Sequence, residues 1–189
     1  MNAYPVIGDD EHQLVALARA GNQAAFSVLA ERHQHEVFTL AMRLAGDRDM
    51  AADISQEALL RAWRGIGKFR GEARFSSWLY RITVNVAWSQ LSRRKRTRES
   101  PLDVVENMAA PASRFSHPEL ALESANLRGR LRRALSALPR RARVVVVLRD
   151  VYGWSHAEIS EALGVSVSAS KVRLHRARKR LRAILENSP

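Results

Sequence analysis

The residues that decide the fold lie near the C-terminus, in the stretch WSHAEISEALGVSVSASKVRLHRARKRL at positions 154–181. Ser155 with Glu158 three residues later is the pattern of a capping box, and Gly164 stands where a turn between two helices needs a positive φ. From Lys171 to Arg182 there are seven Lys or Arg and no Asp or Glu. Two short helices around a glycine, the second strongly basic, predict a helix-turn-helix whose second helix enters a DNA groove.

Within this motif we expect Ile159, Leu163, Val167, Val172 and Leu174 to form a small core. The long cationic side chains of the second helix would then face away from it, toward base edges and phosphates. The alternatives are a solvated basic helix and a basic amphipathic helix lying on a membrane surface.

The composition narrows the class of partner. The chain has 189 residues, a formal net charge of +12 and a pI of about 11.3, and its basic residues cluster at 93–98, 128–143 and 171–182. Clustered positive charge favours nucleic acid as the partner. The absence of cysteine excludes disulfides, thiolate metal sites and cysteine nucleophiles, and we expect no cofactor. Residues 1–11 are polar and acidic, and no apolar run is long enough to span a bilayer, so we expect a cytoplasmic protein without membrane insertion.

The periodicity predicts an all-α chain with two small helical domains joined by a flexible linker. Helices are expected at 13–20, 23–45, 50–64 and 75–96, with Asp49 as a cap, and again from 119 onward. Three prolines between 97 and 118 argue for a linker, with room for a helical turn at 102–108. The valine run at 144–147 has strand propensity, but a single strand would have no partner, so we expect a buried helix. The predicted parts are a flexible N-terminus at 1–11, a four-helix domain at 12–96, the linker at 97–118 and a helix-turn-helix domain at 119–189.

Aromatic and polar side chains alternate with arginine on the predicted fourth helix. Trp78, Arg81, Asn85 and Trp88 fall on one side of it, after a loop that contains Gly71. Such a surface suits unstacked bases, because aromatic rings stack on them and an amide reads their edges. The alternative is that both tryptophans belong to the core.

Three polar side chains on the predicted third helix share one face, because Asp53, Gln56 and Glu57 are spaced at i, i+3 and i+4. This face is either an ordinary solvated surface or, in so basic a chain, a docking site for another protein.

Taken together, four motifs resemble the extracytoplasmic-function (ECF) sigma factors of bacterial RNA polymerase, over roughly residues 14–185. They are Asp53–Glu57 with Leu60 and Trp63; Phe69-Arg70 through Ser77–Ile82 to Asn85; Leu138-Pro139; and Gly153 through Leu163-Gly164 to Arg173–Arg178. Their order and spacing together are specific to that family.

The resemblance implies a non-enzymatic transcription initiation factor, monomeric when free, that binds core RNA polymerase, promoter DNA and an anti-sigma factor and serves a stress regulon. It implies that Asp53, Gln56 and Glu57 dock on the clamp helices of the β′ subunit, and that the C-terminal domain contacts the β flap. For the melted minus-ten element it implies contacts from Lys68, Phe69, Arg70, Ser76, Trp78, Asn85, Arg93 and Arg94. For the duplex minus-thirty-five element it implies contacts from Ser170, Lys171, Arg173, His175, Arg176 and Arg178.

The chain departs from the family pattern at the start of its basic helix. The family commonly has Gly-Thr-Val-Lys-Ser-Arg there, whereas this chain has Ser168-Ala169-Ser170-Lys171-Val172-Arg173. Val172 replaces a small polar residue near the bases, so we expect an unusual promoter preference. Ser160 also replaces a packed alanine, and we expect the fold to accommodate it.

Two other classes of protein share some of these features. A stand-alone helix-turn-helix regulator would explain the C-terminus but not the aromatic and acidic surfaces. An enzyme acting on nucleic acid would need a catalytic cluster, and the only tight group of His and acid is His33, His35 and Glu36. We expect these to be surface residues, because positions two apart diverge on a helix.

Overall fold

The computed structural model describes residues 11–97, 127 and 129–186, and these residues contain helices and no strand. The predicted all-α fold is therefore confirmed for this part of the chain. The chain divides into two compact units, Met1–Arg93 and Arg94–Pro189. The exact domain bounds stay predictions, and most of the proposed linker and the turn at 102–108 lie outside the described residues.

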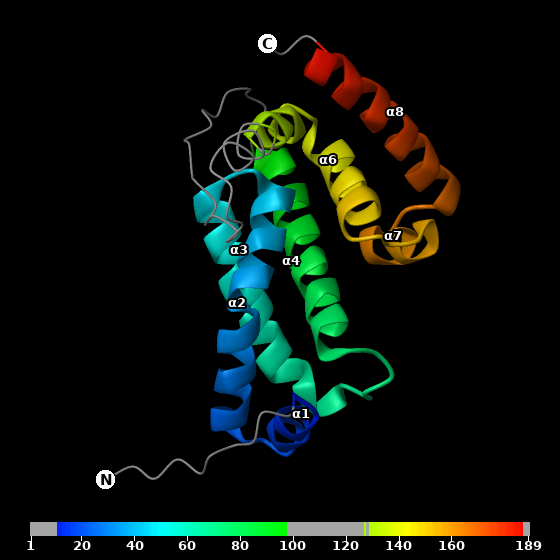
Figure 1. Ribbon diagram of the computed structural model, residues 1–189. Helices are drawn as coiled ribbons and strands as arrows, with labels where there is room; N and C mark the ends of the chain where they lie inside the picture. The colour runs from blue at the N-terminus through cyan, green and yellow to red at the C-terminus, as the bar shows by residue number, and fades with distance from the viewer. Residues whose placement is uncertain (1–10, 98–126, 128, 187–189) are drawn as a thin grey trace. The chain divides into compact units, whose positions relative to one another are not determined.

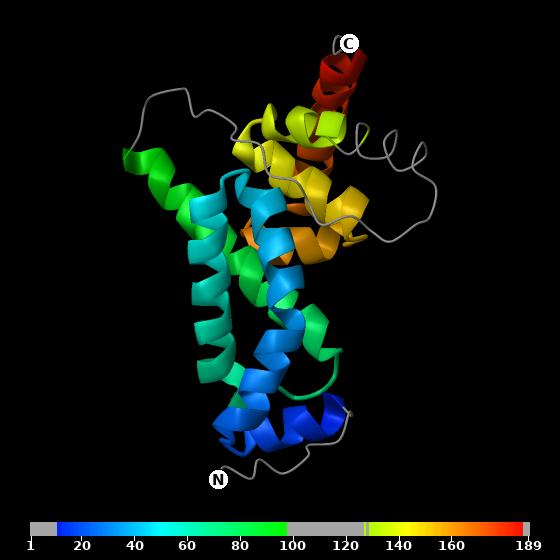
Figure 2. The ribbon, with the colours of Figure 1, turned by 60° about the vertical axis from the view of Figure 1, so that its left-hand side comes forward.

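The N-terminal unit is a bundle of long helices. Figures 1 and 2 show α2, α3 and α4 side by side, with α1 across one end of them. The elements are α1 (Glu11–Arg19), α2 (Gln23–Ala45), α3 (Arg48–Gly65), the 3-10 turn η1 (Ile66–Lys68) and α4 (Phe75–Thr97). Fully buried Leu29, Leu40, Ile54, Leu79 and Val84 form the centre of the core. The bundle thus buries one apolar stripe from each long helix.

Local hydrogen bonds fix where these helices begin and end. The Asn22 side chain caps α2, because it accepts a hydrogen bond from the backbone N–H of Ala25 at 3.0 Å. Gly46 ends α2 with a φ of 71°, which a residue with a side chain rarely adopts. The expected cap of α3 is wrong: Asp47, not Asp49, caps it, accepting from Met50 N–H at 2.7 Å. Asp49 lies inside the first turn instead, where its negative charge interacts favourably with the positive end of the helix dipole.

The C-terminal unit combines several short helices with one long helix, α8. Residues 129–136 are helical and are followed by α6 (Arg140–Val146), the π-helical turn η2 (Val147–Val151), α7 (His156–Leu163) and α8 (Val167–Glu186). The valine run is helical, as expected, and residues 144–148 are almost completely buried. Burial on all sides accounts for its apolar sequence, which a propensity scale alone assigns to a strand.

Candidate nucleic-acid interface

A short loop joins η1 to α4 and exposes its middle while burying its ends. Phe69 and Phe75 are 7% and 4% exposed, whereas Arg70, Glu72 and Arg74 between them are exposed. Their two rings lie 6.1 Å apart, nearly perpendicular to each other. The aromatic contact closes the base of the loop, so its polar residues and charges are presented to solvent.

Trp78 on α4 completes this aromatic cluster. Its ring centroid is 5.0 Å from that of Phe69 and 5.7 Å from that of Phe75, and its side chain is half-buried. Trp78 therefore packs on the loop and still presents part of its surface to solvent. Phe69 itself is buried beneath the loop, so it supports the predicted surface from below.

Lys68, Arg70 and Asn85 of the predicted minus-ten surface are exposed, and Ser76 is partly exposed. Arg93, near the end of α4, is exposed as well, while the side chain of Arg94 lies outside the described residues. On the opposite side of α4, Leu79, Val84 and Val86 are buried. The helix is thus amphipathic, and its exposed side carries residues of the types that contact phosphates and base edges in nucleic-acid complexes.

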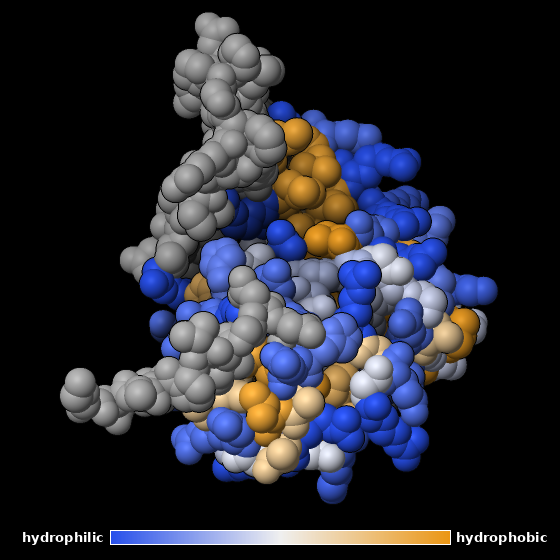
Figure 3. Space-filling view, turned by 60° about the horizontal axis from the view of Figure 1, so that its bottom comes forward, coloured by the Kyte–Doolittle hydropathy of each residue, from blue (hydrophilic) through white to orange (hydrophobic). Residues whose placement is uncertain are grey.

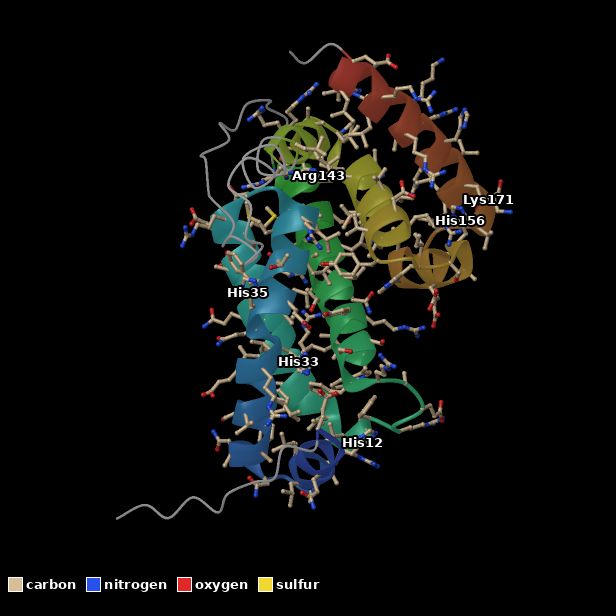
Figure 4. The ribbon with its side chains drawn as sticks, in the orientation of Figure 1. His12, His33, His35, Arg143, His156 and Lys171 are labelled. Carbon is tan, nitrogen blue, oxygen red and sulfur yellow. The ribbon has the colours of Figure 1, made fainter. Side chains whose placement is uncertain are left out.

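The expectation that His33 is a surface residue is wrong. His33 is 9% exposed, and its ring nitrogens lie 3.2 Å from a carboxylate oxygen of Glu11 and 3.4 Å from one of Glu36. Its ring also lies 5.4 Å from that of Phe75. The burial of His33 is not evident from the sequence, because Glu11 and Phe75, which lie against it, come from elements far away in sequence. His35 is exposed, as expected. Figure 4 shows the two histidines on different sides of α2.

Glu36 links the same group to α4. The hydroxyl of Tyr80 donates a hydrogen bond of 2.6 Å to Glu36. This hydrogen bond, with a further contribution from His33, lowers the pKa of the Glu36 carboxyl. The polar group therefore ties α1, α2 and α4 together beside the aromatic cluster.

The acidic face of α3 borders a shallow groove between α3 and α4. Asp53 and Gln56 are exposed, and Glu57 forms an ion pair of 2.6 Å with Arg61. Leu60 is 46% exposed and lies in the same groove. The groove is lined by Asp53, Gln56, Glu57, Leu60, Arg61, Val86, Ser89, Gln90 and Arg93. An exposed leucine among carboxylates and amides is a composition that suits a protein partner.

The helix-turn-helix has the predicted caps. Ser155 accepts from the N–H of Glu158 at 3.2 Å, and the Glu158 carboxylate accepts from the N–H of Ser155 at 2.8 Å. Gly164 ends α7 with a φ of 61°. The hydroxyl of Ser160 donates to the carbonyl oxygen of Val165 at 2.5 Å, so this serine stabilises the turn. The departure from alanine at position 160 is thereby accommodated.

The predicted core of this motif is only partly correct. Ile159, Leu163 and Leu174 are buried, but Val167 and Val172 are 41% and 46% exposed. Ser170 is completely buried, and its hydroxyl lies 3.0 Å from Nδ1 of His156. In this conformation Ser170 faces α7 and is not among the side chains that a DNA groove would meet.

The basic side chains of α8 differ in their exposure and in their partners. Lys171, His175 and Arg176 are exposed. Arg173 is partly buried, and its Nη1 has no hydrogen-bond partner among the described residues. Arg178 pairs with Asp150, which raises the pKa of the Arg178 guanidinium. The exposed face therefore offers Lys171, His175 and Arg176 first, with Arg173 on its flank.

His156 lies beside the start of α8, close to Lys171 (Figure 4). Its partial burial lowers the pKa of the imidazole, and the charges of Arg149, Lys171 and Arg178 lower it further. Hence the neutral ring is the form that suits this position next to Ser170.

Arg143 has a structural role that the sequence pattern does not indicate. It is 6% exposed, and its guanidinium donates to the carbonyl oxygens of Leu135 and Ser136 at 2.9 Å and 2.6 Å. Burial, with a smaller contribution from Arg140, lowers the pKa of Arg143 to about 10. The guanidinium satisfies carbonyls at the end of the 129–136 helix and so attaches that helix to α6.

Seen from the α1 end, the described surface is mostly hydrophilic and is interrupted by hydrophobic patches (Figure 3). Among the described residues there is no group of His, Asp and Glu arranged to hold a metal ion. No described helix is both long and apolar enough to cross a membrane.

Two family models match the chain, one in each unit. The model for sigma-70 region 2 matches residues 29–97, and the model for sigma-70 region 4 matches residues 128–181. The ECF RNA polymerase sigma-E factor of Escherichia coli (strain K12) is 34% identical over 171 residues, which cover 88% of this chain and 89% of that relative. The RNA polymerase sigma-H factor of Pseudomonas aeruginosa (strain PAO1) is 30% identical over 184 residues, covering 94% and 95%.

Solved structures agree with this relationship. The structure of CnrH in complex with the cytosolic domain of CnrY matches with a TM-score of 0.58 and 27% identity, over 95% of this chain and 99% of that one. The sigma factor RpoE of Bartonella quintana, solved with the anti-sigma factor NepR, shares the fold, with a TM-score of 0.61, 24% identity and coverage of 87% and 98%.

Regions 2 and 4 in this order define a sigma factor, the class of protein that gives RNA polymerase its promoter specificity. The chain belongs to the ECF family of sigma factors. It is an alternative sigma factor that initiates transcription, and sigma factors as a class are not enzymes.

Proposed function

We propose that two separate surfaces of the chain read a promoter while a third holds it on core RNA polymerase. The observation that carries this proposal is the outward face of α8, where exposed Lys171, His175 and Arg176 lie away from buried Leu174 and Ala177. This face follows a capped helix and a glycine turn, which is the arrangement that places a recognition helix in the major groove.

In the C-terminal unit, Lys171, His175 and Arg176 contact the duplex minus-thirty-five element. Arginine and lysine donate to guanine and to phosphates, and each good bidentate base contact contributes about 1–3 kcal/mol of discrimination. Arg173 contributes from the flank of the helix. Ser170 supports α8 from its buried side, and Arg178 reaches a phosphate only by giving up Asp150.

In the N-terminal unit, the loop after η1 and the exposed side of α4 hold the melted minus-ten element. Lys68 and Arg70 attract the backbone, and Asn85 and Ser76 read base edges. The exposed part of Trp78 offers a stacking surface for an unpaired base, which is worth about 1–3 kcal/mol. Arg93, together with Arg94, binds the backbone further along α4.

The groove beside Asp53, Gln56 and Glu57 is the surface that we assign to core polymerase. Its exposed carboxylate, amide and leucine groups suit the clamp helices of the β′ subunit, and the C-terminal unit would contact the β flap. Because the promoter surfaces lie in separate units, polymerase would hold them at the spacing of the two promoter elements.

We further propose that the free chain is a cytoplasmic monomer without catalytic activity, held inactive by an anti-sigma factor until a stress releases it. The sigma factor RpoE of Bartonella quintana, which shares this fold, was solved in complex with the anti-sigma factor NepR, and this supports a partner of the same kind.

The test is run-off transcription with core RNA polymerase on a pool of genomic fragments, followed by start-site mapping. We expect specific starts that need both proteins and that share two upstream elements. Arg176→Glu should abolish starts that depend on the upstream element, whereas Asp49→Ala, a charge change on the surface of α3, should leave them unchanged.

The same assay separates this proposal from a stand-alone regulator. A stand-alone regulator binds duplex promoter DNA tightly without core enzyme, whereas we expect weak binding until core is added. The proposal would be refuted if no genomic fragment gave specific transcription starts, or if the Arg176→Glu variant kept full activity.

A further inference from the structure

One apolar side chain stands in the middle of the polar outward face of α8. Val172 is 46% exposed. Ser168, His175, Arg176 and Lys179 lie three, four or seven positions from it and therefore share its face, and all four are exposed. Val172 thus shares its face with His175 and Arg176, two of the residues that we assign to the DNA groove.

This valine is not part of the buried core of the helix-turn-helix. The buried residues of α8 are Ser170, Leu174 and Ala177, which point to the other side of the helix. Val167 is exposed to a similar degree, at 41%, but lies five positions away and so does not share the face of Val172. Val167 is therefore a matched control for Val172. The two valines lie on the same helix and are exposed to a similar degree, but their side chains point in different directions.

The major groove offers such a side chain one kind of apolar target. Each base pair presents donors and acceptors there, and only thymine adds an apolar group, its C5-methyl. Valine has two methyl groups, no donor or acceptor, and a stiff χ1 torsion, so it loses little side-chain freedom on contact. Its position in the N-terminal part of the helix is where recognition helices meet base edges.

We infer that Val172 contacts the C5-methyl of a thymine in the minus-thirty-five element and selects thymine at that position. The inference rests on the proposed seating of α8 in the major groove. A hydrophobic contact of this kind distinguishes thymine from uracil, which has the same hydrogen-bonding groups but lacks the methyl.

The experiment uses full-length protein with core polymerase and a promoter identified by start-site mapping. Each thymine of the minus-thirty-five element, on either strand, is replaced singly by deoxyuridine, and holoenzyme binding is measured by competition against the unmodified duplex. We expect one position at which loss of the methyl weakens binding about fourfold, the effect of leaving one methyl group unburied.

Variants then assign that position to a side chain. Val172→Ala should bind the thymine and deoxyuridine duplexes equally, and Val172→Thr, which keeps one methyl, should retain part of the discrimination. Val167→Ala should retain the full fourfold preference. Because both valines are exposed, all three variants should unfold at the wild-type temperature.

The outcomes distinguish the assignment of α8 to the major groove from the assignment of Val172 to a thymine methyl. If Arg176→Glu abolishes initiation while the wild type binds every deoxyuridine duplex as tightly as the thymine duplex, the Val172 assignment is overturned and the groove assignment stands. Undiminished discrimination in Val172→Ala overturns it as well. If Arg176→Glu initiates normally, the groove assignment and the Val172 assignment are both wrong.

Discussion

The guanidinium of Arg178 on α8 meets the carboxylate of Asp150 in η2 through two hydrogen bonds, one of them 3.1 Å between Nε and Oδ2. The pair joins the basic helix to the turn before the helix-turn-helix. It also pairs the charge of Arg178, a residue that the sequence predicts to contact DNA.

Asp150→Ala should strengthen DNA binding by releasing Arg178. Because the pair is exposed, we expect its loss to cost less than about 1 kcal/mol of stability. The freed guanidinium adds about one phosphate contact, so the salt dependence of holoenzyme binding should become steeper by about one unit. The double variant Asp150→Ala/Arg178→Ala should return to the shallower slope. A slope that steepens equally in the double variant would show that Arg178 is not the group responsible.

Arg143→Met should be among the most destabilising substitutions in the C-terminal unit. It removes the guanidinium from the partly buried carbonyl oxygens of Leu135 and Ser136, of which, among the described residues, only that of Leu135 also accepts from a backbone N–H, that of Leu138. We expect a loss of about 1–3 kcal/mol in the free energy of unfolding. Denaturant unfolding followed by circular dichroism measures this. Arg140→Met is the control on the same helix, and we expect a change within about 0.5 kcal/mol there. Equal effects of the two variants would contradict the role given to Arg143.

The stability of the C-terminal unit should fall as the pH drops below 6.5. The pKa of His156 is lowered in the folded chain, so the unfolded chain binds more protons between the folded pKa and 6.5. The contribution of His156 to the free energy of unfolding is therefore fully present above pH 6.5, and it is lost as the pH falls through the pKa that His156 has in the folded chain. Thermal unfolding between pH 8 and pH 5 should show the loss in wild type and in His175→Gln, but less of it in His156→Gln. An unchanged pH profile in His156→Gln would refute this assignment.

His33→Ala should weaken the base of the loop that we assign to the minus-ten element. It removes the ring beside Phe75 and the partner of Glu11 and Glu36, and we expect a loss of about 1–3 kcal/mol in stability. His35→Ala, two residues away and exposed, should change stability by less than about 0.5 kcal/mol. Denaturant unfolding curves of the two variants measure this difference. If the two curves coincide, His33 contributes no more to stability than an ordinary surface residue.

Asp53→Ala and Gln56→Ala should each weaken binding to core polymerase by at least about fivefold, the effect expected of a central interface residue. Both side chains are exposed beside the groove, so their removal should leave folding and DNA contacts unchanged. Asp49→Ala on the same helix is the control. Fluorescence titration of labelled protein with core enzyme measures the affinity, and wild-type affinity in both variants would leave this face a solvated surface.

The local features of the chain could be predicted from sequence because their causes are local. The capping box of Ser155 and Glu158, the left-handed Gly164 and the bounds of α2 depend on residues within a few positions of one another. The basic character of α8 is likewise a matter of composition. These features, with the order of the four motifs, were enough for the class of fold and the family.

The misassigned residues share a different cause. Asp47 replaced Asp49 as a cap because both have the right chemistry and only the backbone path selects one of them. Val172 was assigned to the core because apolar residues usually are, but Ser170 occupies the buried side and forms a hydrogen bond with His156.

The sequence by itself determined that this protein is helical, basic and built from a sigma-factor region 2 and region 4. Only the tertiary structure decided which of its polar groups are free to act. His33 meets Glu11 across 22 positions, and Arg178 meets Asp150 across 28. Such pairs depend on where packed helices bring side chains together, and no local propensity encodes that distance.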